Sequence, residues 1–403
     1  METEAYKFLA VIAVVAVLGI AVFAMIFPWG ALLPEIPEPG PEPSGAPQFN
    51  VIVLGWDGAQ RDHLRQCYNL ELQECSRGLP NLKQLSGGKI FNITATNGGL
   101  DTKAGWVQVL SGYNAEITGV FDNGKYRPIP EGFSVFEKLR KEFGSDIFTL
   151  FVTAKPLNEG TGCSLDKGPP WCVTKKSIDL FEDGINSNDK VVEDAAKALE
   201  ENKGKSFFAF LQFSEPDRAG HAGNENSIAY SDKIVENDRL LGELMEKLKQ
   251  IGAMEKTFIY VTADHGFDEN TNRHHDAPYV FLATNDPAIV RNGDRKDIAP
   301  TILKKYGIIL GGGDFVPPVD GGPLDSPLAV GCIAERSAFI DYDNAPACCG
   351  GLSLINLSKF NAGDGGCLEA TGGTGDDSGY CTACGNGKCD EPENKCNCPA
   401  DCK

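Results

Sequence analysis

The segment VTADHGFDENTNRHHDAPYVFLAT, residues 261–284, contains three of the five histidines of this 403-residue chain. His265 directly follows Asp264, and His274 and His275 are neighbours. Imidazole and carboxylate side chains together are typical ligands of zinc, and manganese and iron accept the same donors. These residue types in this spacing therefore predict a site for divalent metal ions.

The other candidate ligands occupy equivalent positions beside short apolar runs. Asp57 follows the run 51–55, and Asp217 and His221 follow the run 207–213. If these runs are strands of an open α/β sheet, ligands bind beyond their carboxyl ends, so the acid–imidazole clusters should meet at one edge. Three aspartates and three histidines suffice for two three-ligand sites with open positions. Two adjacent metal ions can clamp an in-line displacement at phosphorus.

Alternating strand-like and helix-like segments must position these residues. Near-continuous apolar runs are typical of strands that are covered on both faces. Amphipathic patterns lie between them at 191–203 and 227–252. The alternation predicts a doubly wound α/β domain with a mostly parallel sheet, ending near residue 310. The predicted strands are 51–55, 91–96, 147–152, 207–213, 257–263 and 279–284.

The segment GGLDTKAGWVQVLSGYNAEITGVFDNG, residues 98–124, contains the candidate nucleophile. Together with GWDG, PDRAGH, ADHG and a late histidine, it resembles the alkaline phosphatase superfamily, and in particular its nucleotide pyrophosphatase/phosphodiesterase branch. The resemblance covers about residues 50–303 and implies an alkaline phosphatase-like fold. It aligns Thr102 with the nucleophilic threonine and Asn123 with the asparagine that binds a phosphoryl oxygen. Read without the resemblance, Thr102 is an ordinary helix N-cap and Asn123 a turn residue.

The resemblance also implies how the metal ligands divide. One ion is expected at Asp217, His221 and His274. The other is expected at Asp57, Asp264 and His265, with the Thr102 oxygen at its open position. His275 is the alternative to His274, and the spacing to Pro278 favours His274. A metal-coordinated threonine hydroxyl becomes a competent nucleophile, which implies a phosphothreonine intermediate.

This chain also departs from the family pattern. Ala104, Gly105 and Trp106 stand where the family has Pro-Asn-His, so a different leaving-group pocket is expected. A sulfatase is the nearest rival, but sulfatases need a Cys or Ser nucleophile. Transfer of phosphoethanolamine or phosphoglycerol is a second rival. A phosphomonoesterase is a third, and it is disfavoured because residues 98–124 contain no arginine to balance the extra phosphate charge. A catalytically silent surface-binding protein is the non-enzymatic alternative. His63 is expected on a helix surface, and Trp56 in the packing.

The N-terminal segment predicts attachment to a membrane. Residues 8–27 form an uncharged apolar run long enough to cross a bilayer, after a short cytoplasmic segment, 1–7. Residues 28–47 are rich in Pro and Glu and predict an extended spacer. Fourteen cysteines, with close pairs Cys67/Cys75 and Cys163/Cys172, predict disulfides and hence an extracytoplasmic catalytic domain at 48–310.

The remaining chain is expected to form a Gly/Cys-rich irregular extension, 311–380, and a cysteine-rich tail module, 381–403. The tail has six cysteines, which predicts three disulfides within it. Its acidic residues offer a possible calcium site: Asp390, Glu391, Glu393 and Asp401. A net charge of −19 argues against nucleic-acid duplex binding and leaves a small phosphodiester or nucleotide-like molecule as the expected substrate.

Overall fold

The computed structural model describes residues 47–75, 77–95, 99–160, 162–164, 167–275, 277, 279–308 and 319–326, and short segments between 338 and 402. The expected anchor at 8–27, and all of the expected spacer except Pro47, lie outside these residues. Within the described part of the chain, no helix combines the length and the apolar character needed to span a bilayer.

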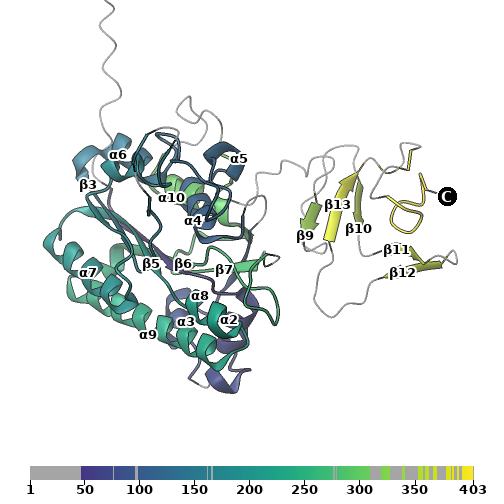
Figure 1. The fold of residues 1–403 in the computed structure, drawn as a ribbon, viewed down its shortest axis with the longest axis horizontal. Coiled ribbons are helices and arrows are strands. Elements are labelled where there is room, and N and C mark those ends of the chain that lie inside the picture. Colours follow the sequence, from purple (N-terminus) through teal and green to yellow (C-terminus); the bar gives the residue numbers. More distant parts are fainter. Residues whose placement is uncertain are drawn as a thin grey trace, which may run out of the picture. The chain divides into compact units, whose positions relative to one another are not determined.

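An eight-stranded mixed sheet forms the centre of the catalytic domain (Figure 1). Its order is β4-β3-β5-β1-β6-β7-β2-β8, and neighbouring strands run parallel except at β7, which is antiparallel to both β6 and β2. The fold class expected from the sequence is therefore confirmed for this domain. The strands are β1 (Asn50–Trp56), β2 (Phe91–Thr94), β3 (Ile147–Thr153), β4 (Leu180–Glu182), β5 (Ser206–Phe213), β6 (Thr257–Thr262), β7 (Tyr279–Thr284) and β8 (Gly293–Asp294).

Helices cover both faces of this sheet (Figure 1). One layer contains α2 (Arg61–Tyr68), α3 (Pro80–Ser86), α7 (Asn188–Glu201), α8 (Asp217–Gly223) and α9 (Ile228–Gln250). The other contains α4 (Thr102–Ser111), α5 (Ala115–Thr118), α6 (Val135–Phe143) and α10 (Ile298–Lys305). Short 3₁₀ turns lie at Gln73–Cys75, Gly144–Asp146, Thr174–Ser177, Met254–Lys256 and Arg295–Asp297.

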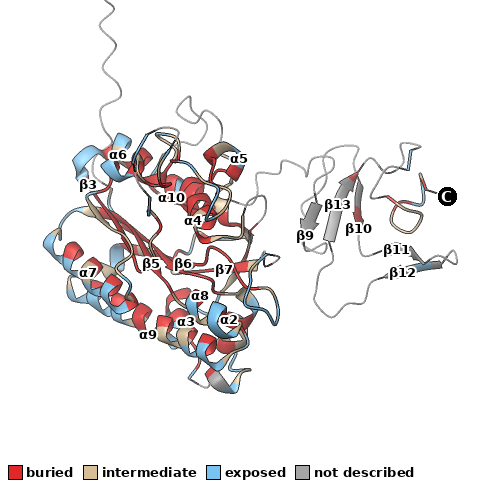
Figure 2. Ribbon diagram, viewed as in Figure 1, coloured by how far each residue is buried: buried red, intermediate tan, exposed pale blue. Residues whose placement is uncertain are grey.

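Burial explains why the central strands are so apolar. Every residue of β1 and β3 is buried, because helices pack on both faces of the sheet (Figure 2). The helices, in contrast, begin at polar side chains that cap their first turns. Ser134 and Glu137 form a capping box at the start of α6, and Ser227 accepts a hydrogen bond from the Tyr230 N–H at the start of α9.

The segment 319–326 packs against the catalytic domain. Leu324 is fully buried, and its carbonyl oxygen accepts a hydrogen bond from the Val290 N–H (3.1 Å). The Arg291 side chain donates to the carbonyl oxygen of Gly322 (2.6 Å). The ordered packing around α10 therefore continues beyond residue 310, where the sequence pattern of strands and helices ends.

The C-terminal segments form two small antiparallel sheets. One has the order β10-β13-β9 and the other is the pair β11-β12. Their strands are β9 (Ala338–Ile340), β10 (Ser353–Asn356), β11 (Lys359–Ala362), β12 (Gly366–Glu369) and β13 (Ser378–Thr382).

The disulfides of the catalytic domain are those predicted from the sequence, whereas those of the tail differ from the prediction. Cys67 pairs with Cys75, and Cys163 with Cys172, as the close spacing predicts. Among the described residues of the tail, Cys384 pairs with Cys398 and Cys389 pairs with Cys402. The prediction of three disulfides within the tail is wrong, because Cys396 pairs with Cys367 of β12. The crosslink joins the tail to the preceding hairpin, so the tail is not a self-contained unit.

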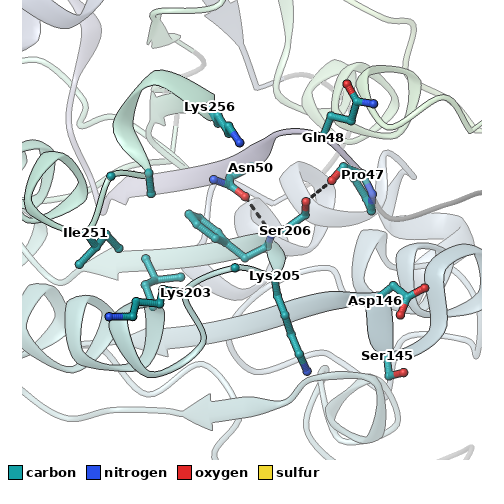
Figure 3. Close-up of a pocket in the computed structure, with 15 residues that line it drawn as sticks. Pro47, Gln48, Asn50, Ser145, Asp146, Lys203, Lys205, Ser206, Ile251 and Lys256 are labelled. Atoms are coloured by element: carbon teal, nitrogen blue, oxygen red, sulfur yellow. Dashed lines mark hydrogen bonds between the residues drawn. The ribbon is translucent and has the colours of Figure 1, made fainter.

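A hollow of about 650 Å³ lies at the amino-terminal ends of the strands (Figure 3). It is lined by Asn50 at the start of β1, by Ser206 at the start of β5, and by the side chains of Lys203, Lys205 and Lys256. The acid–imidazole clusters follow the carboxyl ends of the same strands. This hollow and the candidate site are therefore at opposite edges of the sheet.

Candidate metal centre and nucleophile

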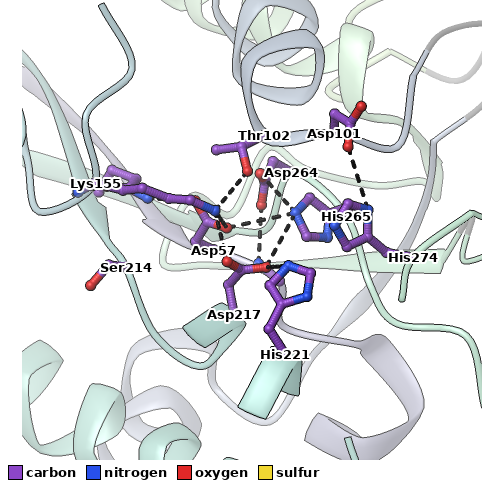
Figure 4. Close-up of polar contacts among 12 residues, drawn as sticks. Asp57, Asp101, Thr102, Lys155, Ser214, Asp217, His221, Asp264, His265 and His274 are labelled. Atoms are coloured by element: carbon purple, nitrogen blue, oxygen red, sulfur yellow. Dashed lines mark hydrogen bonds and ion pairs between the residues drawn. The ribbon is translucent and has the colours of Figure 1, made fainter. Parts of the chain in front are cut away.

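The carboxyl edge of the sheet brings the predicted aspartates together. Asp57 follows β1, Asp217 is the first residue of α8 after β5, and Asp264 lies two residues after the end of β6. All three carboxylates are buried, at no more than 1% exposure. His265 Nε2 lies 3.6 Å from an oxygen of Asp57, 3.7 Å from Asp217 and 3.5 Å from Asp264 (Figure 4).

His274 joins this group through the direction of β7. Because β7 runs antiparallel to β6, the loop between them stays at the carboxyl edge. The His274 ring stacks on His265 at 4.0 Å and lies 5.1 Å from the ring of His221. His275 is exposed, and its backbone N–H donates to Asp268 (2.9 Å). The geometry thus puts His274, rather than His275, beside the other candidate ligands.

At this edge of the sheet, two groups of ligand atoms are close enough to hold a metal ion. One comprises Asp57, Asp264 and His265, as the resemblance implies. The other comprises Asp217, His265 and His274. His221 lies at its rim, with Nε2 3.3 Å from an Asp217 oxygen and Nδ1 2.9 Å from the Asn272 carbonyl oxygen. His265 therefore belongs to both groups.

Unsatisfied buried atoms support the metal interpretation. Asp217 Oδ1, Asp264 Oδ2 and His265 Nε2 are buried and have no hydrogen-bond partner in the described part of the chain. Buried polar atoms are nearly always paired, so these three need a ligand that the protein itself does not provide. Oxygen and imidazole nitrogen are donors that zinc and manganese accept. The residues present therefore fit a pair of divalent ions.

The pKa values reflect the same concentration of negative charge. Burial, together with the Asp264 carboxylate, raises the pKa of Asp57 to about 7. Burial likewise raises the pKa of Asp264 to about 7. Burial would also raise the pKa of Asp217, but the nearby His221 imidazole and the charge of Lys155 outweigh it and lower that pKa. Metal ions at this edge would remove the mutual repulsion of these carboxylates.

Lys155 is a site residue that the sequence analysis missed. Its Nζ lies 2.7 Å from Asp217 Oδ2, 3.1 Å from Asp57 Oδ1 and 2.8 Å from Thr102 Oγ1 (Figure 4). Burial lowers the pKa of this lysine, but the carboxylates of Asp57 and Asp217 outweigh burial and raise it. Lys155 follows β3 at the carboxyl edge. The rule that ligands bind beyond the carboxyl ends of the strands, here called the strand-end rule, therefore applies to this lysine as it does to the Asp and His residues.

Thr102 begins α4, and its side chain is almost fully buried. The N-cap of this helix is Asp101, so the alternative reading of Thr102 as an N-cap is wrong. The hydrogen bond from Lys155 directs the Thr102 hydroxyl to the edge of the acid–imidazole group. The Thr102 hydroxyl therefore lies beside the candidate metal ligands.

Asn123 reaches the start of the same helix from a distant loop. Its side-chain oxygen accepts a hydrogen bond from the Lys103 N–H (3.0 Å), and its own backbone N–H donates to Asp101 Oδ2 (3.3 Å). The amide oxygen is thereby occupied, which leaves the side-chain NH₂ group as the donor for a substrate oxygen. The expected neighbourhood of Thr102 and Asn123 is present.

Two other expectations concern packing. Ala104, Gly105 and Trp106 are buried, and a Cβ on Gly55 would lie 2.4 Å from the Trp106 ring. These substitutions for Pro-Asn-His therefore pack α4 onto the sheet. Trp56 is buried against Phe281, as expected.

The expectation that His63 lies on a helix surface is wrong. It is 3% exposed, with Nε2 2.8 Å from Ser231 Oγ, because α9 packs over α2.

Arg295 supports the site from behind. It is fully buried and donates to the carbonyl oxygens of Asp264 and Gly99 and to the Gln108 side chain. One guanidinium thus connects the Asp264 loop with the start and the middle of α4. No short sequence motif indicated this role.

The comparisons with known proteins agree with this geometry. Residues 51–301 match the family described as type I phosphodiesterase / nucleotide pyrophosphatase. A bis(5'-adenosyl)-triphosphatase of Xenopus laevis is 22% identical over 236 residues, 58% of this chain and 50% of that protein. A 2,3-bisphosphoglycerate-independent phosphoglycerate mutase of Metamycoplasma hominis is 28% identical over 141 residues, 32% of this chain and 26% of that protein. The chain thus spans half or less of the length of these relatives.

A solved structure supports the fold. A 2-O GAG sulfatase superposes with a TM-score of 0.50 and 13% sequence identity, covering 76% of this chain and 80% of the sulfatase. At this identity the likeness concerns the fold alone.

Proposed function

Because the chain belongs to the type I phosphodiesterase / nucleotide pyrophosphatase family of the alkaline phosphatase superfamily, we propose that it hydrolyses phosphodiester or pyrophosphate bonds with Thr102 as the nucleophile. The observation that carries this proposal is the position of the Thr102 hydroxyl. Thr102 is the first residue of α4, and its hydroxyl accepts a hydrogen bond from Lys155. The hydroxyl faces the edge of the sheet where three carboxylates and His265 converge.

The proposal assigns the predicted residues to two divalent ions. Asp57, Asp264 and His265 would hold one ion. The other would be held by Asp217, His221 and His274. Zinc suits these donors best, with manganese as the alternative. When bound, the two ions supply Lewis acidity to the attacking and leaving oxygens of the displacement.

The protein's own residues account for the remaining chemistry. The Lys155 ammonium donates to Thr102 Oγ1 and so favours loss of the hydroxyl proton. Thr102 Oγ1 then bonds to phosphorus as the ester bond to the leaving group breaks, and the leaving alkoxide takes up the proton lost from Thr102. This gives a phosphothreonine that still carries the other ester group of the substrate. Water cleaves this intermediate, restores Thr102 and releases a phosphate monoester. The Asn123 amide is placed to donate to a phosphoryl oxygen, where negative charge develops.

We also propose an extracytoplasmic, membrane-anchored location. The uncharged segment 8–27 is long enough for a single span. The disulfides Cys67–Cys75 and Cys163–Cys172 in the catalytic domain favour an oxidising compartment.

Lys155 also favours a second candidate, hydrolysis of phosphate monoesters. In the sequence, the lack of an arginine in 98–124 disfavours this activity. Lys155 brings a cation to Thr102 from another strand and can balance additional phosphate charge. A sulfatase remains disfavoured, since Thr102 cannot mature to formylglycine.

The experiment that separates these functions is a chromogenic panel with the purified fragment 48–403 and added zinc or manganese. The panel comprises a phosphate monoester, a phosphate diester, a nucleotide diester and a sulfate ester. We expect turnover of the diesters by the wild-type protein and accumulation of phosphothreonine, detected by mass spectrometry after rapid acid quenching.

Thr102→Ala should abolish diester turnover while both metals stay bound, and Thr102→Ser should keep partial activity because it retains the hydroxyl. If Thr102→Ala turned over diesters at a rate near wild type, the covalent mechanism would be wrong.

A further inference from the structure

A second group of oxygen atoms lies beside the candidate active site, where two loops meet. One loop follows α8 and contains Glu225 and Asn226. The other is the 266–275 loop and contains Glu269 and Asn270. Glu225 Oε1 accepts hydrogen bonds from the backbone N–H of Asn270 and from the Asn226 side chain. No ion pair to either glutamate is present in the described part of the chain.

The Asn226 side-chain nitrogen lies at the centre of this group. It is 2.7 Å from Glu225 Oε1, 3.1 Å from Glu269 Oε1 and 3.0 Å from Asn270 Oδ1. An amide NH₂ group has only two hydrogens, so it cannot satisfy three oxygens. Two carboxylates and an amide oxygen therefore converge on one neutral group.

Glu225 provides an independent indication of a missing ligand. Its side chain is fully buried, and its Oε2 has no hydrogen-bond partner in the described part of the chain. Burial is the main cause that raises its pKa, and the Glu269 carboxylate adds to the effect. A buried carboxylate without a nearby cation is unfavourable unless an ion or another strong partner completes its surroundings.

We propose that these four residues bind one calcium ion at the position that the Asn226 amide nitrogen now occupies. The donors are all oxygen, which suits a hard cation and disfavours zinc. Glu225 Oε1, Glu269 Oε1 and Asn270 Oδ1 surround that position at 2.7, 3.1 and 3.0 Å. A small inward movement would bring them to the roughly 2.3–2.6 Å of calcium–oxygen bonds. The Asn226 side chain must swing out of this position to admit the ion, and its carbonyl oxygen can then serve as a further ligand. Asn226, Glu269 and Asn270 are exposed, so water can complete the six to eight ligands that calcium takes.

Such an ion would order the loop that carries His274. The 266–275 loop is already joined to α8 beside the cluster: His221 Nδ1 lies 2.9 Å from the Asn272 carbonyl oxygen, and the Asn272 side chain donates to the His221 carbonyl oxygen (3.3 Å). Calcium between Glu225 and Glu269 would add a second connection. The proposal does not depend on which reaction the site catalyses.

Isothermal titration of calcium into the zinc-loaded fragment 48–403 tests the proposal. Zinc loading keeps calcium away from the candidate active site. Glu225→Gln should lower the calcium stoichiometry by one per chain. It should also remove the calcium-induced rise in melting temperature. Glu246→Gln, an exposed change on α9, is the matched control and should keep both.

Without calcium, Glu225→Gln should melt at or above the wild-type temperature, because glutamine still accepts from the Asn270 N–H but carries no buried charge. A calcium stoichiometry that is equal in Glu225→Gln and wild type would overturn the proposal. The same conclusion would hold if the wild-type protein bound no calcium. A remaining calcium in Glu225→Gln would belong to another site, such as the acidic tail.

Discussion

Lys155 is the side chain whose role can be tested most directly. It lies within hydrogen-bond distance of Thr102 and of two carboxylates. Lys155→Ala should lower kcat by about 10²–10³-fold with a smaller change in KM, because the ammonium stabilises charge that develops on the reacting oxygens. Lys155→Arg should restore part of the rate. Steady-state kinetics on the best diester of the panel gives these values.

The exposed Lys176, which pairs with Glu131, provides a control, and Lys176→Ala should leave both constants unchanged. Zinc analysis of each variant distinguishes lost chemistry from lost metal. If Lys155→Ala kept a wild-type kcat, the lysine would act only as a countercharge for the metal-free carboxylates.

The role of a single residue was predictable where one rule specifies both the type of residue and its position in the fold. The strand-end rule located Asp57, Asp217, Asp264 and His265, all of which lie in one buried group. The same rule applies to Lys155, but a lysine after a strand is common and usually solvated. Arg295 was not predictable, because its contacts are to two carbonyl oxygens and a glutamine that are brought together only by the fold.

At the level of elements, the packing of α4 against the Asp264 loop sets the distance between nucleophile and metal ligands. Gly105 allows this approach: a Cβ there would lie 2.6 Å from Asp264 Cβ and 2.8 Å from its carbonyl oxygen. Alanine inside a helix is normally more favourable than glycine by roughly 1 kcal/mol. Gly105→Ala should instead destabilise by about 1–3 kcal/mol, the usual cost of overpacking, and weaken zinc binding.

Denaturant unfolding and zinc titration of the same preparations measure both effects. Gly322→Ala is a suitable comparison, because its nearest contact would be an ordinary 3.4 Å to the Arg291 side chain. A stabilised Gly105→Ala protein with wild-type zinc affinity would show that α4 can shift without disturbing the site.

The sequence predicted the main elements well because their patterns are local. The predicted strands at 147–152 and 279–284 correspond to β3 and β7. The direction of β7 was not predictable, since an apolar run has the same pattern whether its neighbour is parallel or antiparallel. That direction nevertheless decides that His274 returns to the carboxyl edge.

At the scale of the whole molecule, sequence composition located the change near residue 310 but did not predict the packing of the chain beyond it. The Gly-rich segment after α10 has no periodic pattern, yet residues 319–326 pack on the catalytic domain. The pairing of Cys367 with Cys396 was likewise hidden, because cysteine spacing does not determine connectivity. Both features depend on contacts between segments distant in sequence.

Leu324 tests whether this late segment belongs to the folding unit of the catalytic domain. Its side chain is fully buried in the same core as α10, whereas the side chain of its neighbour Val290 is 59% exposed. Leu324→Ala should lower the free energy of unfolding by about 2–5 kcal/mol, the range for a buried leucine, and Val290→Ala should change it by less than about 0.5 kcal/mol. Urea unfolding of the fragment 48–403, followed by tryptophan fluorescence, measures both, since Trp56, Trp106 and Trp171 are all buried in the catalytic domain. Equal, small effects of the two variants would mean that the segment lies on the domain without contributing to its stability, and that the unit ends with α10.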